Sequence, residues 1–249
     1  MFFIAVAVFR RSDLRVDRRD LPLISFFGVF ALAGVQWAYY ESIQRLPLGV
    51  ALVIQYTGPL VMLAYARWRG LRVGGRLWLA GALTLAGSFL VVGAYDADLL
   101  SLNLAGIPYA VLSMVIFVVY FLLAERILAR YAVWTLLVYG FGSALVAWTI
   151  VRPIWLLPWT VVAEPVNTAL LAGVIVFGTT LPFALIFLSV SLIPAARTGL
   201  TSTAEPVVAV VAAWLLLSEM LAVPQLIGGA VVLVGIAVAQ SLRPSAGSV

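Results

Sequence analysis

The chain has 249 residues, 64% of them hydrophobic and 10% charged, with a mean hydropathy of +1.14. Soluble domains carry about a quarter charged residues, so this composition indicates an integral membrane protein. Cysteine and histidine are absent, which excludes disulfides, His/Cys metal sites and Ser-His-Asp catalysis, and we expect no cofactor and no metal. The net charge of +5 comes from arginines placed mainly in loops, where membrane topology explains them better than a nucleic-acid partner does.

The N-terminus differs from a signal peptide. Residues 1–9 are apolar and are followed by Arg10 and Arg11, whereas a signal peptide carries its positive charge before the apolar run. At about 1.5 Å per residue this run covers less than half of a bilayer. We interpret it as the end of a helix whose start is missing from the chain.

Hydrophobic runs of about 20 residues predict eight full membrane-spanning helices. Short links join them, and only the Pro- and Trp-rich link 152–167 is longer. The tail 244–249 is expected to be disordered. The expected spans are 21–43, 47–66, 76–95, 105–124, 132–151, 168–191, 194–217 and 223–242.

Arginine placement predicts the orientation of these spans. Most of the 15 basic residues lie in alternate loops, whereas the opposite loops hold only Arg45 and Arg152. The positive-inside rule places the arginine-rich loops, and with them the C-terminus, in the cytoplasm.

An internal repeat appears at an offset of 147 residues, at which Gly58-Pro59 aligns with Glu205-Pro206. Three helices in 21–95 then correspond to three in 168–242, and two further helices precede the second copy. The unit therefore has five helices, and an odd number places the two copies in opposite orientations, as in secondary transporters. We predict an all-α integral membrane fold, a polytopic helical bundle of two inverted five-helix repeats. The first repeat (1–100) is N-terminally incomplete and the second is 101–243.

Several segments of the second copy carry a family resemblance, namely 178–184, 194–200, 204–209, Leu217-Ser-Glu219, Gly228-Gly-Ala and Gly235. They resemble the EamA-type branch of the drug/metabolite transporter superfamily. The resemblance implies a ten-helix, two-repeat carrier of small metabolites, often an exporter, in the cytoplasmic (inner) membrane of a bacterium or archaeon. The first copy departs from the family, with Gly58-Pro59 and Leu71-Arg72 where Glu-Pro and Gly-Glu are often found. Some amino-acid-exporting branches look similar there.

Glu205 is the strongest candidate for a functional residue. A carboxylate at mid-membrane depth is costly and rarely persists there without a partner or a task. Thr198, Thr201, Ser202 and Glu205 recur at helical spacing and form one polar stripe, which would face a partner helix or a watery cavity. Glu205 would contact solute or couple transport to protons. The structural alternative is that it hydrogen-bonds backbone opened by the neighbouring proline.

Both copies carry a proline at the same place, Pro59 and Pro206, and each predicts a helix kink because proline removes one helical hydrogen bond. The kink is the shared part of the repeat. The acid is present in the second copy only.

Polar side chains of two other helices suit a cavity that binds an amphipathic solute. They are Gln36, Tyr39 and Tyr40 in the first full helix and Gln55 and Tyr56 in the next. Helix packing with an outer aromatic belt is the alternative, which we favour for Tyr39 and weigh equally for Gln36 and Gln55.

Two further features are interpreted as structural. Glu41 and Arg45, four residues apart at an outer helix end, predict an interfacial salt bridge rather than a gate. Small residues seven apart permit close helix packing in both copies, and they are Gly81 with Ser88 and Gly228 with Gly235.

We predict a membrane transporter, an exporter of amino acids, related metabolites or amphipathic compounds, that binds solute near mid-membrane and works by alternating access. The expected partners are a small-molecule solute and the lipid bilayer. Proton coupling through Glu205, facilitated diffusion and the oligomeric state stay open. A membrane enzyme would need further catalytic groups near Glu205, which the sequence lacks. A truncated non-transporting protein or assembly partner is the remaining alternative.

Overall fold

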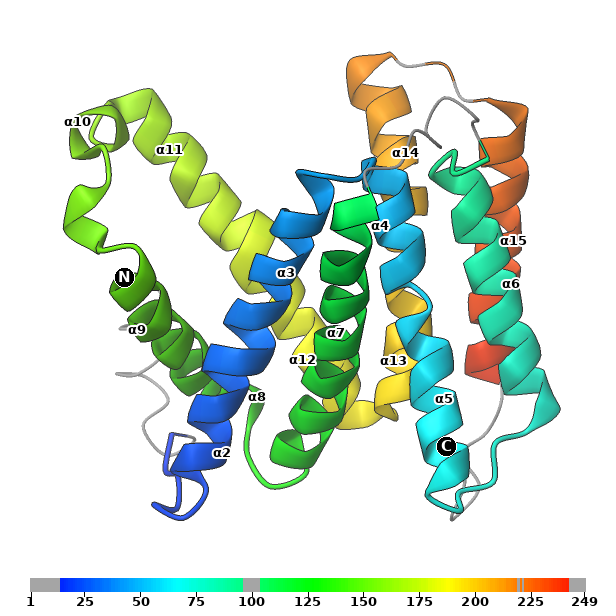
Figure 1. Ribbon diagram of the computed structural model, residues 1–249, viewed down its shortest axis with the longest axis horizontal. Coiled ribbons are helices and arrows are strands. Elements are labelled where there is room, and N and C mark those ends of the chain that lie inside the picture. Colours follow the sequence, from blue (N-terminus) through cyan, green and yellow to red (C-terminus); the bar gives the residue numbers. More distant parts are fainter. Residues whose placement is uncertain (1–13, 96–103, 219, 221, 242–249) are drawn as a thin grey trace. The chain divides into compact units, whose positions relative to one another are not determined.

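The computed structural model describes residues 14–95, 104–218, 220 and 222–241 (Figure 1). The interpretation of 1–9, the expected disorder of 244–249 and Glu219 of the family segment lie outside the described residues. Within them the chain is helical, without a β-strand.

Seven helices of the described residues are long and apolar enough to cross a membrane. They are Leu21–Ile43, Leu48–Trp68, Ile107–Leu128, Val133–Val151, Pro165–Leu192, Ala195–Leu216 and Val223–Ser241. A shorter apolar helix, Gly75–Val91, corresponds to the remaining predicted span, so each of the eight predicted spans has a helix in the structure. The predicted all-α, polytopic fold is confirmed.

Several of these spans are built from shorter elements. The two longest interruptions of regular α-helix are the seven-residue π-helices η1 and η6. In chain order the elements are α2 (Leu21–Phe26), η1 (Phe27–Ala33), α3 (Gly34–Ile43), α4 (Leu48–Gln55), α5 (Gly58–Trp68), α6 (Gly75–Val91), η3 (Leu104–Gly106), α7 (Ile107–Leu128), α8 (Val133–Thr135), η4 (Leu136–Gly140), α9 (Phe141–Val151), η5 (Ile154–Leu156), α10 (Trp159–Val162), α11 (Pro165–Gly173), η6 (Val174–Thr180), α12 (Leu181–Leu192), α13 (Ala195–Ser202), α14 (Glu205–Leu217) and α15 (Val223–Ser241).

Several predicted bounds differ from the structure by a few residues, and two departures have a clear local cause. The span predicted to end at residue 95 ends at Val91, because the chain leaves the helix at Gly93, whose φ is 71°. Glycine enters this left-handed region without steric cost, so it ends a helix inside a sequence that is still apolar. The link 152–167 is partly helical, since it contains η5 and α10.

The internal repeat is visible in the element bounds. The π-helix Phe27–Ala33 recurs 147 residues later as Val174–Thr180. Helix α4 (Leu48–Gln55) recurs at the same offset as α13 (Ala195–Ser202). The same local backbone irregularities therefore occur in both copies, at the offset that the sequence alone predicts.

The structure divides into two compact units, each described by itself. Unit 1 combines the described residues up to Ala33 with Leu123–Ile193, and unit 2 combines Gly34–Leu122 with the chain from Pro194. Each unit thus contains parts of both predicted repeats.

Unit 1 is held by aromatic packing and by a glycine contact. The rings of Phe27 and Phe187 meet edge to face with centroids 5.9 Å apart, and both side chains are fully buried. Gly28 of η1 lies against the carbonyl of Gly140 in η4, where a Cβ atom would clash with backbone. The glycine therefore permits close approach of the two helices in lipid.

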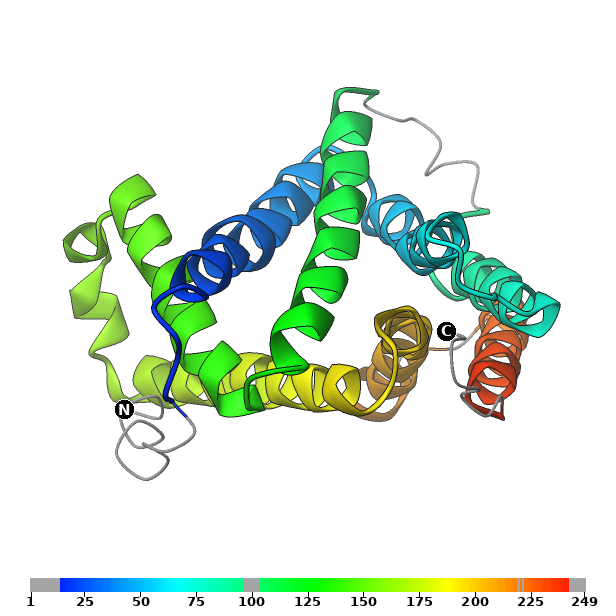
Figure 2. The ribbon, with the colours of Figure 1, turned by 90° about the horizontal axis from the view of Figure 1, so that it is seen from below.

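In unit 2, helices α6 and α15 lie side by side, as Figures 1 and 2 show. Gly87 of α6 opposes Gly228 of α15, while Ala80, earlier in α6, opposes Gly235, later in α15. The two helices therefore run antiparallel. Because α6 and α15 are equivalent in the repeat, this is the opposite orientation expected of an inverted repeat.

Candidate functional site

Two spans of unit 2 are interrupted near their middle. Helix α4 ends at Gln55 and α5 starts at Gly58, and α13 ends at Ser202 and α14 starts at Glu205. Proline is the second residue of the following helix in both cases. It has no N–H to continue the helical ladder, so each break leaves carbonyl groups without their usual partner.

Hydroxyl side chains bond several carbonyl groups next to these breaks. Thr57 Oγ1 donates to Ile54 O at 2.6 Å before the first break. Thr203 Oγ1 donates to Leu200 O, also at 2.6 Å, before the second. Backbone groups in a bilayer need internal partners, so these threonines help irregular backbone to persist at mid-membrane depth.

The two breaks are joined by a tyrosine and a carboxylate. Tyr56, the residue after α4, donates from its hydroxyl to Glu205 Oε2 at 3.4 Å, and only 4% of Tyr56 is exposed. The hydroxyl of Tyr39 in α3 lies within electrostatic range of the same carboxylate. Glu205 itself is exposed and begins α14, where the helix dipole favours a negative charge.

A second contact brings the broken helices together. Gly199 of α13 faces α5, and a Cβ atom on it would lie 3.4 Å from Pro59 Cγ and closer still to Met62. Glu205 is the eleventh residue of the 22-residue span Ala195–Leu216, so the site lies at mid-span. The broken helices thus meet near the middle of the membrane.

The hydroxyl stripe of α13 is largely engaged with its own helix. Thr201 Oγ1 donates to Arg197 O at 3.0 Å and accepts from Gln240 Nε2 at 2.7 Å. Ser202 Oγ donates to Thr198 O at 3.1 Å, and Thr198 is 2% exposed.

The amide and phenol candidates are scattered rather than gathered. Gln55 Oε1 accepts from Ser113 Oγ at 3.5 Å. Gln36 is half-buried and Tyr40 is 53% exposed, and neither side chain makes a hydrogen bond within the described part of the chain. The Tyr40 ring lies 5.9 Å from that of Tyr39.

The residue that sequence reasoning undervalued is Tyr56. The sequence groups it with Gln55 as a cavity residue, but nothing in the sequence connects it to Glu205, which is 149 positions away. The one usable signal is its place three residues before Pro59, as Thr203 stands three residues before Pro206. Tyr39, for which we favour a packing role, interacts electrostatically with the same carboxylate.

The predicted salt bridge between Glu41 and Arg45 is confirmed. Arg45 also donates to the Glu41 carbonyl at 2.6 Å, and its guanidinium carbon lies 4.6 Å from the ring centroid of Tyr109. Trp37 meets the same ring edge to face at 5.9 Å. The pair is therefore part of a packed aromatic cluster that ties α3 to the start of α7.

Chemically, the junction offers one carboxylate and phenol groups near the middle of a membrane span. Such a group attracts cations and hydrogen-bond donors, including a protonated amine. In the residues that the structure describes, no cluster of three or more acidic residues could hold a metal ion.

Fold and site together define a polytopic α-helical membrane protein of the inverted-repeat type. The EamA-like transporter family model matches residues 1–93 and 104–240, so the chain belongs to this family of membrane transporters.

Individual relatives agree with this placement. The threonine/homoserine exporter RhtA of Escherichia coli K12 is 28% identical over 238 residues, covering 92% of this chain and 75% of RhtA. An uncharacterized transporter of Archaeoglobus fulgidus is 26% identical over 95% of this chain and 82% of its own length. The uncharacterized inner membrane transporter YicL of Salmonella typhimurium is 26% identical over 87% of this chain and 72% of its own length.

A solved crystal structure shares the fold. It superimposes with a TM-score of 0.77 at 19% identity, over 96% of this chain and 82% of the other.

Proposed function

We propose that the protein exports amino acids or similar amphipathic amines across the cytoplasmic membrane of a bacterium or archaeon. The solute binds where the two broken helices meet, and the site opens alternately to each side. The threonine/homoserine exporter RhtA, 28% identical to this chain, supports this solute class and direction.

One observation carries the proposal, the hydrogen bond between Tyr56 and Glu205 at the mid-span junction. A carboxylate in the middle of a membrane span normally pairs with a cation or a hydrogen-bond donor. The observed partner of Glu205 is the Tyr56 phenol, which carries no positive charge. A protonated amine would supply that charge, while the half-buried Tyr39 presents apolar ring surface to the rest of an amphipathic solute.

The proposed orientation follows the arginines. Their loops face the cytoplasm, as does the C-terminus, and the name of the inner membrane transporter YicL supports the choice of membrane. Two reporters fused to the C-terminus test this orientation. A reporter that works only in the cytoplasm should show activity, and one that works only outside the cytoplasmic membrane should show none.

The test of Glu205 is a transport assay with a matched control. The purified chain and its Glu205→Gln variant are reconstituted in liposomes and assayed for counterflow of labelled threonine, homoserine and a panel of amino acids. Hydrogen bonds to charged groups contribute about 1.5–3 kcal/mol, so transport should fall by about 10- to 150-fold. Glu164→Gln serves as the control, because Glu164 is an exposed loop acid.

A pH series separates proton coupling from facilitated diffusion. We propose that Glu205 exchanges a proton during the cycle, so that a pH gradient drives wild-type transport but not transport by Glu205→Gln. Normal transport by Glu205→Gln at every pH, with normal protein levels, would refute this role. Gradient-independent transport that still requires Glu205 would support solute binding alone.

A further inference from the structure

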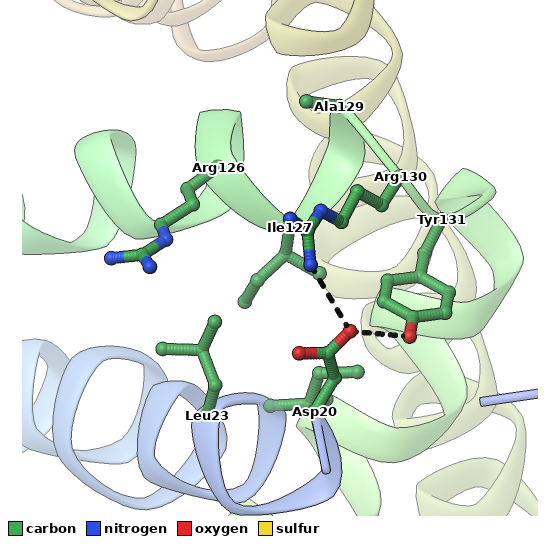
Figure 3. Close-up of a pocket in the computed structure, with 8 residues that line it drawn as sticks. Asp20, Leu23, Arg126, Ile127, Ala129, Arg130 and Tyr131 are labelled. Carbon is green, nitrogen blue, oxygen red and sulfur yellow. Dashed lines mark hydrogen bonds and ion pairs between the residues drawn. The ribbon is translucent and has the colours of Figure 1, made fainter. Parts of the chain in front are cut away.

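Unit 1 contains a cavity that the transport site does not use. It has a volume of about 230 Å³ and lies between the start of α2 and the end of α7. Figure 3 shows Asp20 and Leu23 on one side of it and Arg126, Ile127 and Arg130 on the other. The lining thus combines two guanidinium groups with apolar side chains.

The positive charge of this cavity is only partly neutralised. Arg130 Nη1 lies 3.6 Å from Asp20 Oδ2, and the Arg130 side chain is 75% exposed. Asp20 also accepts a 2.7 Å hydrogen bond from the Tyr131 hydroxyl, which further occupies its carboxylate. The Arg126 side chain is exposed and makes no hydrogen bond or ion pair with any other described residue.

The surroundings are also basic. Across the α2 and α7 ends, the described segments carry more arginines than carboxylates. The arginines are Arg15, Arg18, Arg19, Arg126 and Arg130, and the carboxylates are Asp17, Asp20 and Glu125.

The cavity lies at the level where two spans end, since one span begins at Leu21 and another ends at Leu128. A lipid phosphate occupies this level, with its first acyl carbons directed toward the hydrocarbon. We propose that the cavity binds the headgroup of an anionic phospholipid, with Arg126 and Arg130 on the phosphate and the half-buried Leu23 against the adjoining acyl carbons.

The apolar wall favours a lipid over a free phosphate ion, which would gain nothing from Leu23, Ile24 and Ile127. The dipole at the end of α7 also favours positive charge there without any ligand. The helix dipole does not explain why Arg126, whose exposed side chain has no described ion-pair partner, lines a cavity with an apolar wall. An anionic phospholipid offers a phosphate to the two arginines and acyl carbons to the apolar part of the lining.

The test measures lipid retention by the full chain. Detergent-solubilised protein is titrated with phosphatidylglycerol or phosphatidylcholine of equal chain length, and bound lipid is counted by native mass spectrometry. We expect preferential retention of phosphatidylglycerol. Each arginine removed should weaken it about fivefold, so Arg126→Gln together with Arg130→Gln should weaken it about 30-fold.

Two further variants sharpen the result. Arg67→Gln combined with Arg76→Gln removes the same charge from exposed helix ends of unit 2 and should leave retention unchanged. Asp20→Asn should strengthen retention, because it removes the competing carboxylate while keeping an acceptor for Tyr131. If the double variant fails to fold, Arg126→Gln alone decides the matter, since it breaks no described ion pair.

Several outcomes would overturn the proposal. Equal retention of the two lipids would exclude recognition of headgroup charge, and an equal loss in the control pair would show a diffuse surface effect. Displacement of phosphatidylglycerol by submillimolar inorganic phosphate would identify a free-anion site.

Discussion

The close contact between α6 and α15 yields a sharp prediction, because two adjacent glycines of α15 have opposite surroundings. Gly228 faces backbone of α6, whereas Gly229 faces the side chain of Val207. Gly228→Ala and Gly229→Ala add the same methyl group to neighbouring buried positions of one helix. Effects on the unfolded chain are therefore alike, and the variants differ mainly in what the methyl group meets.

The difference can be estimated from the distances. A Cβ atom on Gly228 would lie 2.7 Å from Gly87 O and 2.9 Å from Val91 N, whereas ordinary contact starts at 3.4 Å. The helices must separate by about 0.7 Å at a backbone contact, and such overpacking costs about 1–3 kcal/mol. A Cβ atom on Gly229 meets Val207 at 3.5 Å, so alanine there keeps its helix-propensity gain of about 1 kcal/mol.

The propensity gain is common to both variants, so they should differ by the overpacking cost of about 1–3 kcal/mol in unfolding free energy, or about 2–12 °C in Tm for a chain of this size. Tryptophan fluorescence during heating in detergent measures Tm, since the chain has eight tryptophans. Gly228→Ala should unfold at the lower temperature. Equal Tm values, or a lower value for Gly229→Ala, would show that the antiparallel contact of α6 with α15 is wrong.

Two other substitutions test the packing around the site. Arg45→Gln should lower the unfolding free energy by about 1 kcal/mol, since it removes the ion pair with Glu41 and the contact with the Tyr109 ring. High salt should reduce this loss, and a loss that is the same at high salt would show that the ion pair does not contribute to stability. Thr201→Val removes the acceptor of the exposed Gln240 amide and should cost about 0.5–1.5 kcal/mol, read as a lower Tm. An unchanged Tm would show that this hydrogen bond contributes nothing to stability.

The spans could be predicted because lipid makes a strict demand on sequence. About 20 apolar residues are needed per crossing, and charged residues accumulate between crossings. Each of the eight predicted spans is found, with ends that differ by a few residues. The errors arise where hydropathy is uninformative, as at Gly93, where backbone conformation rather than polarity ends the helix. The π-helices η1 and η6 likewise depend on hydrogen-bond register, which composition does not encode.

The site could be predicted in part. Glu205 and the two prolines stand out because a carboxylate and a missing N–H are costly in lipid whatever surrounds them. Tyr56 does not stand out, since a phenol is amphipathic and its importance comes from a contact made across 149 positions. Helical spacing groups the hydroxyl stripe correctly, but spacing does not reveal that Thr201 and Ser202 donate to carbonyl groups of their own helix.

The two breaks share a backbone design and differ in their chemistry, and packing explains the difference. Gly58 occupies the position equivalent to Glu205, and a Cβ atom on it would lie 3.0 Å from Phe117 Cδ1, so an acid there would displace that ring. Glu205 instead extends to the phenol of Tyr56, whose own repeat partner is Thr203, a buried side chain bonded to its own helix. One break thus supplies a carboxylate and the other a phenol. A zwitterionic solute bound at the junction would meet negative charge from one side only, so the related helices could hold it in a single orientation.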